Sequence, residues 1–181
     1  PIVGDLKNIL TEINEKLKDK SNKEWHEKIK EWKEEYPLIY KKQDESKLCP
    51  QEVLEKINSI VKGEAIIVTD VGQHQMWAAQ YLDYEKPNTI CTSGGAGTMG
   101  FGLPAAIGAQ VAKPKEKVIA IVGDGGVQMN IQELMVAKQY NLPVKIVILN
   151  NSYLGMVRQW QEMFNEKRYS FVDLTHNPDF V

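Results

Sequence analysis

Two short polar motifs, each directly after an apolar run, are the part of this sequence best suited to chemistry. Gly-Asp-Gly at 123–125 follows the run at 118–122, and Asn-Asn at 150–151 follows the run at 144–149. Both runs are short, continuous and rich in β-branched residues, which is typical of buried parallel strands. Because ligands bind at the carboxyl ends of such strands, these oxygen-bearing side chains and flexible glycines favour a hard cation that carries a phosphate ester.

The spacing of the two motifs matches one crossover between neighbouring strands. Residues 126–149 separate them, which is enough for a helix and the next strand. We therefore expect Asp124 and Asn151 at adjacent strand ends. There, their side-chain oxygens can coordinate one Mg²⁺ and leave positions for phosphate oxygens and water.

The elements that must position these motifs alternate from residue 50 onward. Pro50 suits the first turn of a helix, and Asn130 with Glu133 predicts a capping box at the start of another. The sequence predicts strands at 65–68, 89–91, 118–122 and 144–149, and helices at 50–62, 74–82, 103–112 and 131–140. This alternation predicts an α/β fold, an open parallel sheet with helices on both faces.

Residues 1–47 differ from the rest of the chain. Two helical apolar stripes lie in this region, the first after an expected N-cap at Asp5. The stripes consist of Leu6, Ile9, Leu10, Ile13 and Leu17, and of Trp25, Ile29, Trp32 and Tyr36. We favour two amphipathic helices that dock on other protein. A partner-binding or membrane-surface helix is the weaker alternative, because acidic residues interleave with the lysines. Residues 38–49 resemble a linker.

Composition excludes several classes of function. The 181 residues are 43% hydrophobic and 25% charged, as in globular proteins, and the net charge of −2 argues against nucleic acid as the main partner. No apolar run approaches the ~20 residues that span a bilayer, and no signal peptide is recognisable. Cys49 and Cys91 form no CxxC pair, which favours reduced thiols and a cytoplasmic location. The two chain ends lead us to expect a fragment of a longer polypeptide.

The glycine-rich stretch at 93–102 formally matches the dinucleotide fingerprint through Gly95, Gly97 and Gly100. Asp124 lies about where a ribose-binding acid would be expected, so a Rossmann oxidoreductase is an alternative. Its weakness is that Asp124 stands inside Gly-Asp-Gly and that the next strand ends in Asn-Asn. A P-loop is excluded, because no Gly-Lys-Ser/Thr follows the glycines.

The three histidines carry weaker signals. His74, in Gln-His-Gln at 73–75, is a candidate general acid/base or phosphate donor, and equally a satisfied polar residue at a strand end. His26 and His176 receive no role. The sequence contains no recognisable catalytic triad or zinc constellation.

Three longer motifs resemble the large, catalytic subunits of acetolactate synthase (acetohydroxyacid synthase), a family of thiamine-diphosphate enzymes. They read VGQHQMWAAQ at 71–80, GGAGTMGFGLPAAIG at 94–108 and LNNSYLGMVRQWQ at 149–161. The resemblance covers nearly the whole chain. One departure is Gly-Gly at 125–126, where relatives often have Ala or Gly followed by Ser, so a hydroxyl contact near the diphosphate is lost.

The resemblance also implies a division of the chain and a set of site residues. Residues 1–19 would be a remnant of the central, FAD-associated domain, 20–49 a helical linker, and 50–181 a thiamine-diphosphate-binding domain cut at its carboxyl end. Mg²⁺ would be bound by Asp124, Asn151 and the backbone carbonyl of Tyr153. The diphosphate would be contacted by Gln73, His74 and the backbone at Gly123, Gly125 and Gly126.

Three further residues would act around the organic part of the cofactor. Gly97 and Met99 would both contact the cofactor. Met99 would lie beneath the bent cofactor and hold its V shape, as a polarizable and adaptable side chain can. Met156 and Trp160 would line the channel for substrate and for sulfonylurea-type inhibitors; Met156 would also contact the cofactor.

The implied reaction decarboxylates pyruvate and joins the hydroxyethyl unit to a second 2-ketoacid, pyruvate or 2-ketobutyrate, in branched-chain amino acid biosynthesis. The implied assembly is a homodimer with shared active sites, FAD in the full-length enzyme and a possible small regulatory subunit. The activating glutamate lies on another domain in this family and is absent here, so the chain alone is expected to be inactive. The alternatives are another thiamine-diphosphate decarboxylase or carboligase, a Rossmann oxidoreductase, or a non-enzymatic binding module.

Overall fold

The computed structural model describes residues 1–18, 20–42, 44 and 46–181. The chain divides into two compact units, Pro1–Tyr40 and Lys41–Val181. The linker expected at 38–49 contains residues 43 and 45, and residue 19 ends the expected first domain. These three residues lie outside the described ones, and the predicted domain boundaries stay predictions.

The first unit contains two helices, α1 (Leu6–Lys16) and α2 (Lys23–Glu35), neither of which has a buried residue. The N-cap predicted at Asp5 is present, since its side chain accepts the Asn8 N–H at 3.2 Å. The docking of these helices stays a prediction. Among the described helices, none has the length and apolar character that crossing a membrane requires.

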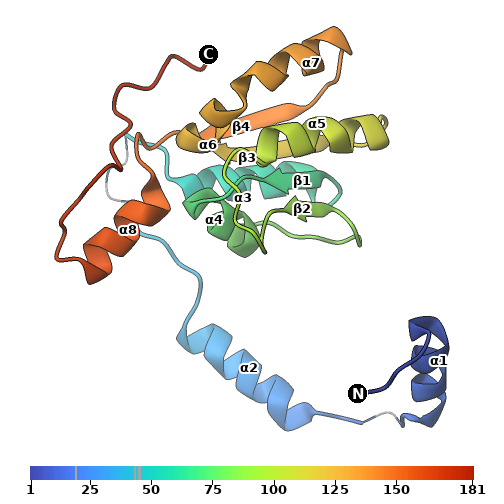
Figure 1. The fold of residues 1–181 in the computed structure, drawn as a ribbon. Coiled ribbons are helices and arrows are strands. Elements are labelled where there is room, and N and C mark those ends of the chain that lie inside the picture. The colour runs from blue at the N-terminus through green and yellow to red at the C-terminus, as the bar shows by residue number, and fades with distance from the viewer. Residues whose placement is uncertain (19, 43, 45) are drawn as a thin grey trace. The chain divides into compact units, whose positions relative to one another are not determined.

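The second unit is built on a parallel sheet, which confirms the predicted α/β fold (Figure 1). The sheet has the strand order β2-β1-β3-β4. The strands are β1 (Ile66–Thr69), β2 (Ile90–Thr92), β3 (Val118–Gly123) and β4 (Lys145–Leu149). The helices are α3 (Pro50–Val61), α4 (Gln73–Tyr81), α5 (Gly102–Ala112), α6 (Asp124–Met129), α7 (Leu134–Gln139) and α8 (Gly155–Phe164), with a 3₁₀ turn at Ile131–Glu133.

Helices cover both faces of the sheet, and β3 shows this most clearly. Its residues Ala120 and Val122 belong to the core shared with Leu103 of α5. Its residue Ile121 belongs to a second core with Leu54 of α3 on the opposite face. Because a strand buried on both faces is apolar at almost every position, β3 is a continuous apolar run, and β1 is apolar until its last residue, Thr69.

The strand order creates a switch point between β1 and β3. The chain leaves β1 toward β2 on one side and leaves β3 toward β4 on the other. Connections that diverge in this way open a crevice at the carboxyl ends of the two strands, where α/β proteins bind ligands. Asp70 follows β1 and Asp124 follows β3 at this edge.

One predicted helix is wrong at its start. The chain enters α6 directly after β3, and the helix expected at 131–140 is a 3₁₀ turn followed by α7. Asn130 makes no side-chain cap; its Nδ2 instead donates to the carbonyl of Gly100 at 2.7 Å. A contact from a distant loop therefore outcompetes the local capping box that the sequence suggests.

Candidate cofactor-binding site

A pocket of about 330 Å³ lies at the carboxyl ends of the strands. It is formed by the residues after β1, by the start of α6, by the β4–α8 segment and by Met99 from the glycine-rich loop. The predicted site residues that line it are Gln73, His74, Met99, Gly123, Asp124, Gly125, Gly126, Asn151, Tyr153, Met156 and Trp160. Gly97 is the predicted site residue that does not line it; it adopts φ +64° two residues before Met99.

Asp124 is the buried carboxylate of this pocket, with 2% of its surface exposed. Its Oδ2 accepts a hydrogen bond from Nδ2 of Asn177 at 2.6 Å. Asn177 also donates to Oδ1 of Asn150 at 3.2 Å and accepts from Nε2 of Gln128 at 2.9 Å. The Asp124 carboxylate is therefore oriented by a network that reaches it from the carboxyl-terminal segment.

The turn after β4 is held from several sides. Asn151 Oδ1 accepts the Tyr153 N–H at 3.0 Å, and its Nδ2 donates to Oε1 of Gln73 at 3.4 Å. Tyr153 pairs with Asp173 in an antiparallel bridge, and the Arg158 guanidinium lies 3.9 Å from the centre of the Tyr153 ring. These contacts fix the backbone whose carbonyl is the third expected metal ligand.

The three metal ligands that the resemblance implies are one carboxylate, one amide and one backbone carbonyl, all hard oxygen ligands of the kind that Mg²⁺ prefers. The described residues hold no cluster of three His, Cys, Asp or Glu side chains suited to a metal. The donor set therefore fits a cation that binds few protein ligands and keeps oxygens from water or phosphate.

His74 brings a buried nitrogen to the pocket. Burial lowers the pKa of its imidazole to about 4, so the ring is neutral at neutral pH. Within the described residues its Nε2 has no hydrogen-bond partner. Since buried polar atoms are almost always paired, a ligand group in the pocket is the natural partner for this nitrogen.

Backbone amides supply the electropositive part of the pocket. Among the described residues, no lysine or arginine lines it. Both α4 and α8 begin there, and their N-cap residues Gly72 and Leu154 make no side-chain cap. The Gln75 N–H in the first turn of α4 donates to the Gly72 carbonyl at 3.1 Å, which leaves the N–H groups of Gln73 and His74 and those of the first turn of α8 for an anion.

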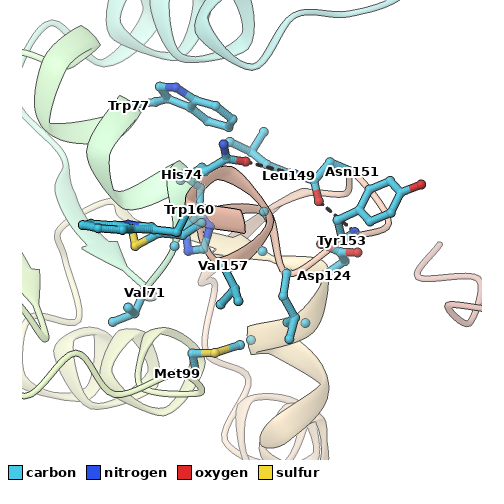
Figure 2. A pocket seen from close by; sticks show the side chains of 18 residues that line it. Val71, His74, Trp77, Met99, Asp124, Leu149, Asn151, Tyr153, Val157 and Trp160 are labelled. Carbon is cyan, nitrogen blue, oxygen red and sulfur yellow. Dashed lines mark hydrogen bonds between the residues drawn. The ribbon is translucent and has the colours of Figure 1, made fainter. Parts of the chain in front are cut away.

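The pocket has a polar side and an apolar side. Figure 2 shows Asp124, Asn151 and Tyr153 on one side and Met99 and Trp160 on the other. Met156 and Trp160 both come from α8, four residues apart, so they share one helix face. Trp160 is 59% exposed. This division suits a ligand with an anionic end and an aromatic end.

The fold does not use the glycines as a dinucleotide fingerprint would. A Cβ added at Gly95 or Gly97 would meet no protein atom within 4 Å, so neither glycine is required for packing against another segment. The Gly100 amide, just before α5, already donates to the carboxylate of Asp70 at 2.9 Å. In a Rossmann fold a pyrophosphate would occupy this place.

A family model described as "Thiamine pyrophosphate enzyme, C-terminal TPP binding domain" matches residues 70–181. The chain belongs to this family. The matched range holds every segment that lines the pocket, so the pocket lies within the TPP-binding domain.

The chain is also similar to the large subunits of acetolactate synthases, which confirms the resemblance inferred from the motifs. It is 49% identical to the acetolactate synthase large subunit of Buchnera aphidicola subsp. Schizaphis graminum over 185 residues, covering 100% of this chain and 32% of the relative. It is 47% identical to the acetolactate synthase isozyme 3 large subunit of Escherichia coli, covering 100% and 33%. For the large subunit of Lactococcus lactis, the identity is 47% and the coverage 99% and 31%. The chain thus spans about a third of the length of these curated relatives.

Two residues at the site were missed by sequence reasoning. Asp70 directly follows a predicted strand, and its carboxyl group binds the N–H of Gly100, 30 residues away. Asn177 reaches Asp124 across 53 residues. An acidic residue directly after a buried strand was an available signal for Asp70, and no local signal marks Asn177.

Proposed function

We propose that this chain is the part of an acetolactate synthase large subunit that binds thiamine diphosphate through Mg²⁺. The observation that carries the proposal is the pairing of hard oxygen donors at adjacent strand ends with a pocket that has no lysine or arginine among its described lining residues. A diphosphate in such a pocket needs a cation, and Asp124, Asn151 and the Tyr153 carbonyl can hold one.

Each side of the pocket has its own task in this proposal. Gln73, His74 and the backbone amides of Gly125 and Gly126 hold the diphosphate beside the metal. Met99 supports the organic part of the cofactor from below. Gly125 allows α6 to pack closely against the segment before α8, since a Cβ there would lie 2.8 Å from Leu154 and 3.7 Å from the Met99 methyl group.

When bound, the cofactor supplies the carbanion chemistry and acts as the electron sink. This chain's residues position it: the polar side anchors the diphosphate, while Met99 and Val71 exclude water from the organic part. Met156 and Trp160 line the path by which pyruvate and a second 2-ketoacid enter. The reaction joins a two-carbon unit from pyruvate to that acceptor, a step toward branched-chain amino acids.

The proposal extends to the assembly that the resemblance to acetolactate synthases implies. The working enzyme is a homodimer of longer subunits with shared active sites, with FAD on the central domain and a small regulatory subunit as a further partner. The group that activates the cofactor lies outside this chain, so we expect no acetolactate from the purified 181 residues; measurable product would contradict this. We place the protein in the cytoplasm, where its free Cys49 and Cys91 stay reduced.

A thermal-shift titration of the 181-residue chain with thiamine diphosphate and Mg²⁺ tests the proposed site. Ligand at 100 times its Kd should add about 2.7 kcal/mol of stability. The Asp124→Ala variant should lose this shift, and an equal shift in both proteins would refute the site.

A further inference from the structure

Asp70 is a fully buried carboxyl group that the proposed chemistry does not use. It is 0% exposed, and burial raises the pKa of its side chain. Oδ1 accepts the N–H of Gly100 at 2.9 Å and that of Val71 at 2.6 Å. A Cβ at Gly126 would lie 2.5 Å from Oδ2 of Asp70. The carboxyl is therefore packed between the end of β1, the glycine-rich loop and α6.

Asn130 binds the backbone carbonyl of Gly100, the glycine whose N–H donates to Asp70. Its Nδ2 donates to the Gly100 carbonyl at 2.7 Å. Gly100 adopts φ +85°, and a Cβ there would lie 2.8 Å from Nδ2 of Asn130. Only glycine therefore fits between Asp70 and Asn130, and both its N–H and its C=O are fixed by side chains from distant segments.

Gly100 immediately follows Met99, the residue of the glycine-rich loop that lines the pocket. The loop before it, at 94–98, is exposed. Its bonds from the Gly97 and Thr98 amides both go to Ser93, within the same loop. We call the two hydrogen bonds of Gly100, from its N–H to Asp70 and from Asn130 to its carbonyl, the Gly100 clamp. This clamp is the nearest contact that ties Met99 to the sheet.

We propose that Asp70 and Asn130 are positioning residues that hold Met99 against the organic part of the bound cofactor. This inference rests on the proposed function. A buried carboxylate bonded to backbone amides is costly to maintain, and such groups concentrate at functional sites. Because the clamp acts through Met99, it should matter for the thiamine part of the ligand and not for the diphosphate.

The test compares two ligands on the 181-residue chain, thiamine diphosphate and inorganic pyrophosphate, each with Mg²⁺. In Asn130→Ala, we expect the Kd for thiamine diphosphate to rise about fivefold, as for one lost hydrogen bond. The Kd for pyrophosphate should not change. Asp70→Asn should also weaken thiamine diphosphate, and amide hydrogen exchange at Gly100 should be faster in both variants.

The matched control is Gln110→Ala, at the far end of α5. Gln110 is 1% exposed and donates to the carbonyls of Lys113 and Glu116. Its loss therefore destabilises α5, the helix that follows the glycine-rich loop, at the end away from the pocket. We expect this variant to keep both affinities.

Each other outcome is decisive. If Asn130→Ala keeps its affinity for thiamine diphosphate, or loses both ligands equally, the inference is wrong while the metal site stands. If the wild-type chain binds the two ligands equally well, Met99 contributes nothing and the inference again fails. If the wild-type chain binds neither ligand, the proposed function fails and the inference fails with it.

Discussion

The units 1–40 and 41–181 both contain apolar patterns, but the structure buries those of the second unit and not those of the first. In the second unit, both faces of β1 and β3 are covered, and Leu54 and Leu103 are almost fully buried. In the first unit, α1 and α2 have apolar stripes but no buried residue. An amphipathic pattern therefore predicts a helix but not what covers it, whereas the β-branched run of β3 predicts both the strand and its burial. The run of β4 also predicts the strand correctly, but this strand lies at the edge of the sheet and is only partly buried.

The largest expected effect is a substitution in the core of the second unit. Leu103→Ala removes a buried side chain that packs on the sheet and should lower the free energy of unfolding by about 2–5 kcal/mol. Leu10→Ala in α1, at a half-exposed position, should cost less than about 1 kcal/mol. Urea unfolding measures both, and equal losses would erase the difference between the units.

The next effect is a pH dependence from His74. Its pKa is lowered from 6.5 to about 4, so the stability due to the neutral ring is complete above pH 6.5 and is lost as the pH falls toward 4. The loss should amount to about 3 kcal/mol.

Urea unfolding of wild type and His74→Gln at pH 7 and pH 4 isolates this contribution. The raised pKa of Asp70 acts in the opposite direction but is common to both proteins. The difference in unfolding free energy between the two proteins should therefore change by about 3 kcal/mol between pH 7 and pH 4. A difference that is the same at both pH values would show that His74 is not buried as a neutral ring.

A smaller effect is expected at Asn177, which orients the Asp124 carboxylate. Asn177→Ala removes the bond to Oδ2 and should weaken Mg²⁺-dependent binding of thiamine diphosphate about fivefold. Thr175→Ala, in the same segment but bonded to Asp173, is the control that should leave this affinity unchanged. Equal affinities in wild type and Asn177→Ala would remove Asn177 from the account.

The smallest effect should come from removing the first unit. Because all described residues that line the pocket lie between 71 and 160, deletion of residues 1–40 should not alter the affinity for thiamine diphosphate. A calorimetric titration of the shortened chain measures this. A lost affinity would mean that α1 or α2 contributes to the site.

Much of the fold and most of the pocket could be predicted from the sequence. The four strands were predicted to within about a residue, and for β1 and β3 the reason is burial on both faces, which leaves a nearly unbroken apolar run. α8 was missed, although Met156 and Trp160 stand four residues apart as on one helix face. The roles of Asn130, Asp70 and Asn177 depend on contacts between distant segments, which no local pattern reports.

The central claim is that Asp124, Asn151 and the Tyr153 carbonyl hold a cation that carries a diphosphate. The most direct measurement is a calorimetric titration of the 181-residue chain with thiamine diphosphate, once with Mg²⁺ and once with a chelator. We expect binding with Mg²⁺ and none with the chelator, and no binding by Asp124→Ala in either case. Equal binding with and without Mg²⁺ would contradict it.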